Sequence, residues 1–149
     1  HRALPHPDLS GCCTCHTLMA TIFTRIIKGE IPCYKIYEDE NYFAFLDINP
    51  LQKGHTLVIP KKEDDYIFNL DDATYSGLMM TAKKIAAAIK ESTNCKRVGV
   101  TVLGMEVPHV HIHLVPMNSE KDMLFSNPKM ELSKEEFEAI AADIAKRVK

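Results

Sequence analysis

Three histidines alternate with apolar residues in the segment His109-Val110-His111-Ile112-His113-Leu114-Val115. Successive side chains of a strand point to opposite faces, so this pattern predicts three imidazoles on one face, about 7 Å apart. The apolar residues between them are then expected to face the core. Packing alone does not explain three titratable rings on one face of a strand. The pattern therefore favours a functional site.

Two kinds of chemistry fit such a row of imidazoles. The first is metal ligation, in which His109, His111 and either His55 or Glu106 supply the three or more ligands that zinc needs. The second is nucleophilic catalysis, in which a neutral imidazole attacks phosphorus and a protonated neighbour binds the developing charge. Histidine suits the second role because its ordinary pKa lies near 6.5. Spacing alone does not separate the two.

The composition of the chain narrows the classes of protein. The 149 residues carry 18 Lys and Arg against 20 Asp and Glu, a net charge of -2, which argues against a nucleic-acid or membrane-surface partner. No apolar run approaches the roughly 20 residues that span a bilayer. Three of the five cysteines crowd into one short stretch at positions 12, 13 and 15. Because that is no disulfide framework, we expect a cytoplasmic protein.

The first residues are unlike the rest of the chain. Residues 1–18 contain three of the seven histidines and show neither helical nor strand periodicity. We expect them to be an extension, disordered or introduced by cloning, with one domain over residues 19–149. The triplet Cys12, Cys15 and His16 could form half of a zinc site, but no second pair of ligands follows at matching spacing.

Hydrophobic periodicity and turn signals predict the elements that carry the histidines. A short helix over residues 22–27 should end at Gly29, a long helix should begin near Asp72, and Ser133 with Glu136 forms a capping box for a final helix. Five strands are expected, at residues 34–37, 42–46, 55–59, 98–103 and 110–115. Since the strands follow one another through short links, we predict an α+β domain with an antiparallel sheet.

The histidine segment, together with residues 22–32, 45–50 and 54–62, resembles the histidine triad (HIT) superfamily, and in particular its small nucleoside phosphoramidase-like branch. The resemblance implies a five-stranded HIT-like fold, a homodimer and a purine nucleotide or nucleoside phosphoramidate as substrate. It implies that His111 attacks the α-phosphorus and forms a nucleotidyl-histidine that water hydrolyses. His113 and His55 would contact phosphate or orient the nucleophile, and His109 would support them. The reaction implied needs no metal or cofactor.

The resemblance also implies a nucleotide pocket. Asp47 would accept the two ribose hydroxyls, although a turn role before Asn49 and Pro50 is the alternative. The backbone N–H of Gly104 is a candidate phosphate contact. The base would lie in an apolar slot formed by Ile22, Phe23, Ile26, Ile31, Phe45 and Ile48. The alternative is that these six residues belong to the ordinary hydrophobic core.

Two positions depart from the family pattern. Thr21 and Thr24 stand where many bacterial members have the cysteines of a structural zinc site; hydroxyls are poor zinc ligands, so no zinc is expected there. Met105 and Glu106 stand where a glutamine and a hydroxyl residue precede the triad. A carboxylate repels phosphate, so a catalytically weak purine-nucleotide-binding module is the alternative function. A His-ligated metalloenzyme is a third.

Overall fold

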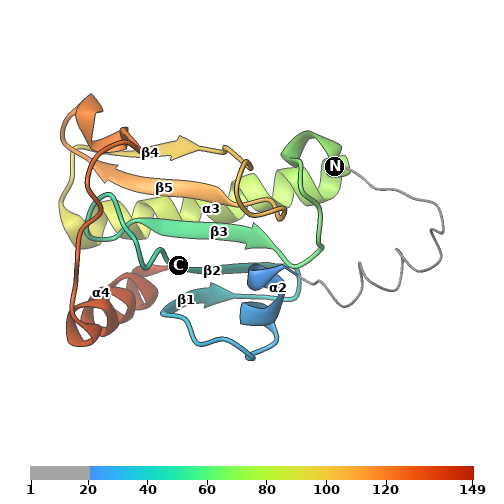
Figure 1. Cartoon of the computed structure of the whole chain (residues 1–149), viewed down its shortest axis with the longest axis horizontal. Helices are drawn as coiled ribbons and strands as arrows, with labels where there is room; N and C mark the ends of the chain where they lie inside the picture. Colours follow the sequence, from blue (N-terminus) through green and yellow to red (C-terminus); the bar gives the residue numbers. More distant parts are fainter. Residues whose placement is uncertain (1–20) are drawn as a thin grey trace.

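A computed structural model describes residues 21–149, and the proposed extension 1–18 lies outside them. The centre is a five-stranded antiparallel sheet in the order β1-β2-β3-β5-β4 (Figure 1). In chain order the elements are α2 (Ile22–Ile27), β1 (Lys35–Glu38), β2 (Tyr42–Leu46), β3 (Thr56–Pro60), a 3-10 helix (Ile67–Asn69), α3 (Asp72–Thr93), β4 (Arg97–Thr101), β5 (Ile112–Met117), a second 3-10 helix (Glu120–Met123) and α4 (Lys134–Arg147). The α+β class and the antiparallel sheet are confirmed.

The sheet separates two apolar clusters. The helices α3 and α4 pack on one face, where the larger cluster includes Val110, Ile112 and Leu114. A smaller cluster on the opposite face joins α2 to β2 and β3 through Phe23, Ile26, Phe43, Phe45, Leu57 and Ile59. The predicted alternation is therefore confirmed, because the apolar residues between the histidines enter the larger core. The histidine-bearing face is the one that α2 partly covers.

The ends of several elements differ from the sequence prediction. The strand expected over 110–115 begins at Ile112, because the N–H of Val110 bonds to the carbonyl of Asp64 instead of to a neighbouring strand. The strand expected over 98–103 ends at Thr101, before the left-handed Gly104. The long helix is capped by Asp71 and not by Asp72. The capping box at Ser133 and the end of α2 near Gly29 are confirmed.

Within residues 21–149, no helix combines the length and the apolar character that crossing a membrane requires.

Candidate active site

The histidines form a more compact array than a regular strand would give. Only His113 lies within β5, whereas His111 directly precedes it and His109 lies in a bend. The ring centroids of His111 and His113 are 4.9 Å apart, and those of His55 and His113 are 5.3 Å apart. The expected spacing of about 7 Å was therefore wrong for His111 and His113, because the extended geometry on which it rests begins only at Ile112. All four side chains are buried.

One ring nitrogen of His111 is oriented by the backbone. Its Nδ1 lies 2.7 Å from the carbonyl oxygen of His109. A carbonyl oxygen only accepts, so Nδ1 must carry the proton and donate it. In the neutral ring the lone pair then resides on Nε2. His111 itself lines a cavity, so a ligand in that cavity can reach this residue.

A second chain of hydrogen bonds orients His55 and His113. The backbone N–H of Leu51 donates to His55 Nδ1 at 3.0 Å, which places the His55 proton on Nε2. That Nε2 lies 3.0 Å from His113 Nδ1 and donates to it. The proton of neutral His113 is therefore on its Nε2. The tautomers of His55 and His113 are both defined, because this chain of hydrogen bonds begins at the N–H of Leu51, which can only donate.

Both of these rings are neutral near physiological pH. Burial lowers the pKa of His55 to about 3, with the nearby His113 adding to the effect. Burial also lowers the pKa of His113 to about 4, helped by His111. The protonated imidazole expected to bind developing charge is therefore not formed by either ring. What His113 supplies in its place is a neutral N–H donor.

Asp47 begins the turn after β2 and also faces the cavity. Its Oδ1 accepts the backbone N–H of Asn49 at 2.8 Å, which is the turn role considered above. Its Oδ2 lies 3.6 Å from His55 Nε2, and because His55 is neutral this contact is not an ion pair. Burial raises the pKa of Asp47. The carboxylate therefore serves the turn with one oxygen, and its other oxygen lies beside His55 in the wall of the cavity.

A metal does not fit these donors well. One ligand atom each from Asp47, His55 and His113 lie within 4.8 Å of one another. A metal there would need the lone pair of His55 Nε2, which requires moving the proton to Nδ1. That proton would then face the N–H of Leu51, so that two hydrogen-bond donors would point at each other and neither would have an acceptor in this contact. His109 is no better placed, since its Nε2 contacts the carbonyl of Pro60 and its Nδ1 contacts Thr21.

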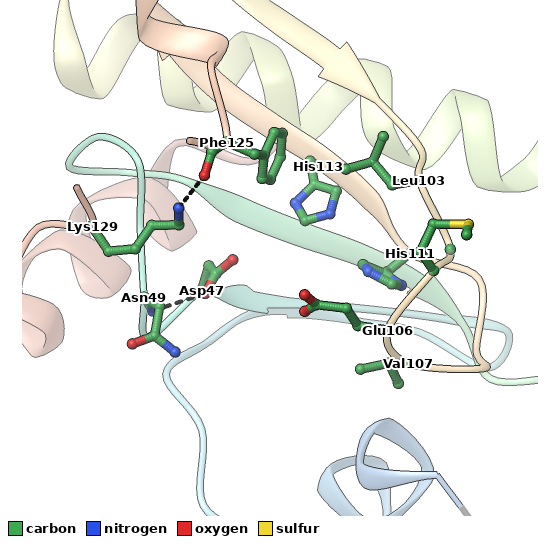
Figure 2. A pocket seen from close by; sticks show the side chains of 11 residues that line it. Asp47, Asn49, Leu103, Glu106, Val107, His111, His113, Phe125 and Lys129 are labelled. Atoms are coloured by element: carbon green, nitrogen blue, oxygen red, sulfur yellow. Dashed lines mark hydrogen bonds between the residues drawn. The ribbon is translucent and has the colours of Figure 1, made fainter. Parts of the chain in front are cut away.

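The cavity beside His111 and His113 has a volume of about 360 Å³. Three segments form its walls: the turn after β2, the loop between β4 and β5, and the segment after β5 (Figure 2). Its lining residues are Asp47, Asn49, Leu103, Gly104, Met105, Glu106, Val107, His111, His113, Phe125 and Lys129. His55 and His109 lie behind this lining, so the structure places only two of the four histidines at the cavity surface.

Two lining residues had no signal in the sequence. The ring of Phe125 meets His113 edge-on, with centroids 4.9 Å apart. Lys129 donates to the carbonyls of Phe125 and Asn127, and Figure 2 shows it across the cavity from Glu106. Neither follows a periodic pattern or a charged motif. They reach the cavity because the chain turns back over β5 after it leaves the sheet.

The six residues expected to hold the base do not line this cavity. Phe23, Ile26 and Phe45 belong to the smaller apolar cluster, and Ile31 packs against it. Ile22 is 47% exposed, and Ile48 is 63% exposed and lies in a different groove, beside Cys33 and Tyr34. Val107 contacts both the cluster and the cavity. A base slot beside the cavity remains a prediction.

Glu106 points into the cavity, on the side opposite Asp47 (Figure 2). The neighbouring Met105 is 88% exposed, and Gly104 adopts a left-handed φ of 70°. The carboxylate that departs from the family pattern is therefore not turned away from the space in which a phosphate would lie.

Comparison with known proteins gives consistent matches. The sequence pattern of the HIT domain matches residues 28–120. An adenosine 5'-monophosphoramidase of Schizosaccharomyces pombe is 36% identical over 133 residues, covering 88% of this chain and 100% of that protein. A Hit-like protein from Bartonella henselae has a similar structure, with a TM-score of 0.75, 30% identity, and coverage of 87% of this chain and 96% of that one. A Zn-bound histidine triad family protein from Mycobacterium smegmatis has a TM-score of 0.72 and 29% identity, over 86% and 95% of the two chains.

Proposed function

The chain belongs to the histidine triad (HIT) family, and on this premise we propose that it cleaves amides or esters of purine nucleoside monophosphates at the α-phosphorus. The observation that carries the proposal is the tautomer of His111, whose Nδ1 proton is held by a carbonyl and whose Nε2 lone pair is left for attack. The similarity to a protein named adenosine 5'-monophosphoramidase supports the substrate class.

The reaction has two steps. His111 Nε2 forms a bond to phosphorus, the bond to the leaving amine breaks, and the amine takes one proton from solvent. The ring then carries a positive charge, which the bond from its Nδ1–H to the carbonyl of His109 stabilises. Water next attacks phosphorus, the bond to His111 breaks, and one proton returns to solvent. The products are the amine and the nucleoside monophosphate.

The surrounding residues bind the phosphate and the ribose of the substrate. In its neutral tautomer, His113 has an Nε2–H that is suited to donating to a phosphate oxygen, and His55 holds that tautomer from behind. In this proposal Asp47, which also lines the cavity, accepts from the ribose hydroxyls. Gly104, which lines the cavity, offers a backbone N–H. A preorganised neutral donor stabilises charge without the cost of burying a cation.

The test of this proposal is to trap the intermediate. Protein mixed with a fluorogenic adenosine phosphoramidate and rapidly quenched should gain the mass of one adenylyl group, and peptide mapping should place it on His111. AMP should follow as product. A chain that releases AMP without any adduct, or that carries the adduct on another residue, contradicts the mechanism.

A second candidate function is a nucleotide-binding module with little turnover, and the orientation of Glu106 favours it. In that case AMP binds but neither adduct nor product forms above the uncatalysed rate. The same quenched-flow experiment, with AMP binding measured by calorimetry, distinguishes the two functions.

Glu106→Gln should tighten AMP binding about threefold to fivefold at low salt, since two like charges near 4 Å repel by about 1 kcal/mol in water. The gain should shrink at high ionic strength because salt screens exposed charges. Calorimetric titrations at two salt concentrations measure the effect. Glu106→Asp is the matched control and should stay close to the unmodified protein. Equal affinity for Gln and Glu at low salt would mean that the carboxylate does not face the phosphate.

We also propose that two copies pair into a homodimer with one continuous sheet. β4 forms one end of the sheet order and pairs with β5. The apolar residues Val100 and Met80, on β4 and α3, are 51% and 61% exposed. An unpaired strand edge beside apolar side chains is suited to association. Sedimentation equilibrium should give twice the chain mass, and a monomer at micromolar concentration would contradict this.

A further inference from the structure

We propose that Thr21 is a positioning residue for the nucleophile, and that Thr24 and Glu63 hold Thr21 in place. A hydrogen-bond network formed by these three side chains fixes the ring of His109, and the carbonyl of His109 in turn orients His111. This inference rests on the proposed function, because the group being positioned is the nucleophile of that reaction.

The ring of His109 is held at both nitrogens. Its Nε2 lies 2.8 Å from the carbonyl oxygen of Pro60, so Nε2 carries the proton and donates it. Burial lowers the pKa of His109, which keeps the ring neutral and leaves a lone pair on Nδ1. The hydroxyl of Thr21 lies 2.9 Å from Nδ1 and donates to it. His109 is fully buried and Thr21 is 8% exposed. Without this hydroxyl, the acceptor would have lost its main partner in the interior.

The direction of the Thr21 hydroxyl is determined by its neighbours. Its oxygen accepts the backbone N–H of Thr24 at 3.1 Å, which caps α2. The hydroxyl of Thr24 donates to Glu63 Oε2 at 2.5 Å, and the N–H of Thr21 donates to the same oxygen at 3.3 Å. With the Thr24 proton directed to the carboxylate, two acceptors remain for the Thr21 proton, Thr24 Oγ1 at 3.2 Å and His109 Nδ1 at 2.9 Å. The nearer is His109 Nδ1, which lies 3.5 Å from the Thr24 hydroxyl and so has Thr21 as its closer partner. The network therefore runs from the exposed Glu63 to the buried imidazole.

The network reaches the nucleophile by a short path. The carbonyl of His109 accepts from His111 Nδ1 at 2.7 Å. Phe23, also on α2, meets the rings of His109 and His111 edge-on, with centroids 5.8 Å and 5.0 Å away. The bonds of the His109 ring to Thr21 and Pro60 anchor the main-chain bend that carries this carbonyl, so losing one of them would let the bend shift and with it the acceptor on which the His111 tautomer depends. Small losses of alignment at an attacking atom cost rate more than affinity.

The experiment compares Thr21→Val with Thr21→Ser. Valine is close to threonine in shape but has no hydroxyl, whereas serine keeps it. Thr21→Val should slow the single-turnover formation of adenylyl-His111 by about tenfold, the smaller of the losses usual when an orienting partner of a histidine is removed. The affinity for AMP should change by less than about twofold, because Thr21 does not line the cavity. Thr21→Ser should restore most of the rate.

The matched control is Thr81→Val. Thr81 is also buried, and its hydroxyl donates to the carbonyl of Gly77 at 2.8 Å within α3, on the other face of the sheet. The Thr81→Val variant should lose stability, as Thr21→Val does, but should form adenylyl-His111 at the rate of the unmodified protein. If the two variants lose rate in equal measure, or if Thr21→Val weakens AMP binding as much as it slows adduct formation, the role of Thr21 is purely structural and the proposal fails.

Two further measurements keep the proposal testable. If Thr21→Val does not fold, Glu63→Ala should slow adduct formation while Glu63→Gln, which keeps an acceptor oxygen, should not. Nitrogen NMR of the unmodified protein reads the tautomer of His109 without any turnover. A proton on Nδ1 overturns the proposal. A proton on Nε2, in a protein that forms no adduct, would mean that the proposed function fails while the network stands.

Discussion

Replacing His111 with alanine should lower turnover of an adenosine phosphoramidate by a factor on the order of 10⁴ or more. The substitution removes the His111 ring and with it the Nε2 lone pair. Among the described residues that line the cavity, this ring is the one whose tautomer a backbone carbonyl fixes so that a lone pair is left for attack. AMP should still bind within severalfold, since Asp47, His113 and the loop backbone are unchanged. Quenched-flow mass spectrometry and calorimetry of the same preparation measure both quantities.

A rescue experiment controls for damage to the fold. His111→Gly leaves space for a free imidazole, and added imidazole should recover part of the activity if only the nucleophile is missing. Residual turnover within tenfold of the unmodified protein would mean that water attacks phosphorus directly, and His111 would then be a binding residue.

Acidification should destabilise the protein before its carboxylates titrate. In the folded state His55 and His113 have pKa values of about 3 and about 4, whereas an exposed histidine titrates near 6.5. Between these values the unfolded chain binds more protons than the folded one. The free energy of unfolding therefore falls as pH falls through this window, and it is fully retained above about pH 6.5. A pKa difference of one corresponds to about 1.4 kcal/mol, so the loss should reach several kcal/mol.

Urea unfolding at a series of pH values measures this slope. Asp47, whose pKa is raised, acts in the opposite sense and offsets part of the loss, because the folded state holds its proton to higher pH. The carboxylates with lowered pKa, such as Asp39 and Asp143, contribute mainly below about pH 4. His113→Gln should flatten the slope between about pH 4.5 and 6.5. If the free energy of unfolding of this variant depends on pH as steeply as that of the unmodified protein, His113 is not the source of the acid sensitivity.

Periodicity and caps were sufficient to predict much of the fold from the sequence. The alternation of Val110, Ile112 and Leu114 correctly gave the buried face of the strand, and Ser133 with Glu136 marked the start of α4. These signals are local, because each depends on residues only a few positions apart. The prediction of the spacing between the imidazoles was wrong because it also used only local signals. The backbone N–H of Val110 bonds to the carbonyl of Asp64, a residue distant in sequence, and this bond takes the place of a strand pairing. The ring of His109 is likewise held by the distant carbonyl of Pro60.

The chemistry of the candidate site depended on contacts that no local pattern encodes. The tautomers of His55 and His111 follow from two backbone groups close in sequence, the N–H of Leu51 and the carbonyl of His109, but the direction of these groups is set by the folded main chain and not by the types of the residues. Phe125 and Lys129 reach the cavity through the return of the chain over β5. Thr21 and Thr24 were noticed only as missing zinc ligands, since the sequence did not show that Glu63 and His109 meet them.

The pairing of β3 with β5 has a consequence for how the chain acquires activity during synthesis. The hydrogen bond between His55 and His113 joins residues 58 positions apart, and the 22 residues of α3 lie between them. Closing so large a loop is entropically costly until the whole sheet forms, so contacts of this kind are slow to develop. A nascent chain holding β1 to β4 has the Leu51 and His55 end of the array but not His111, the proposed nucleophile. The proposed activity then arises only once β5 has left the ribosome and closed the sheet.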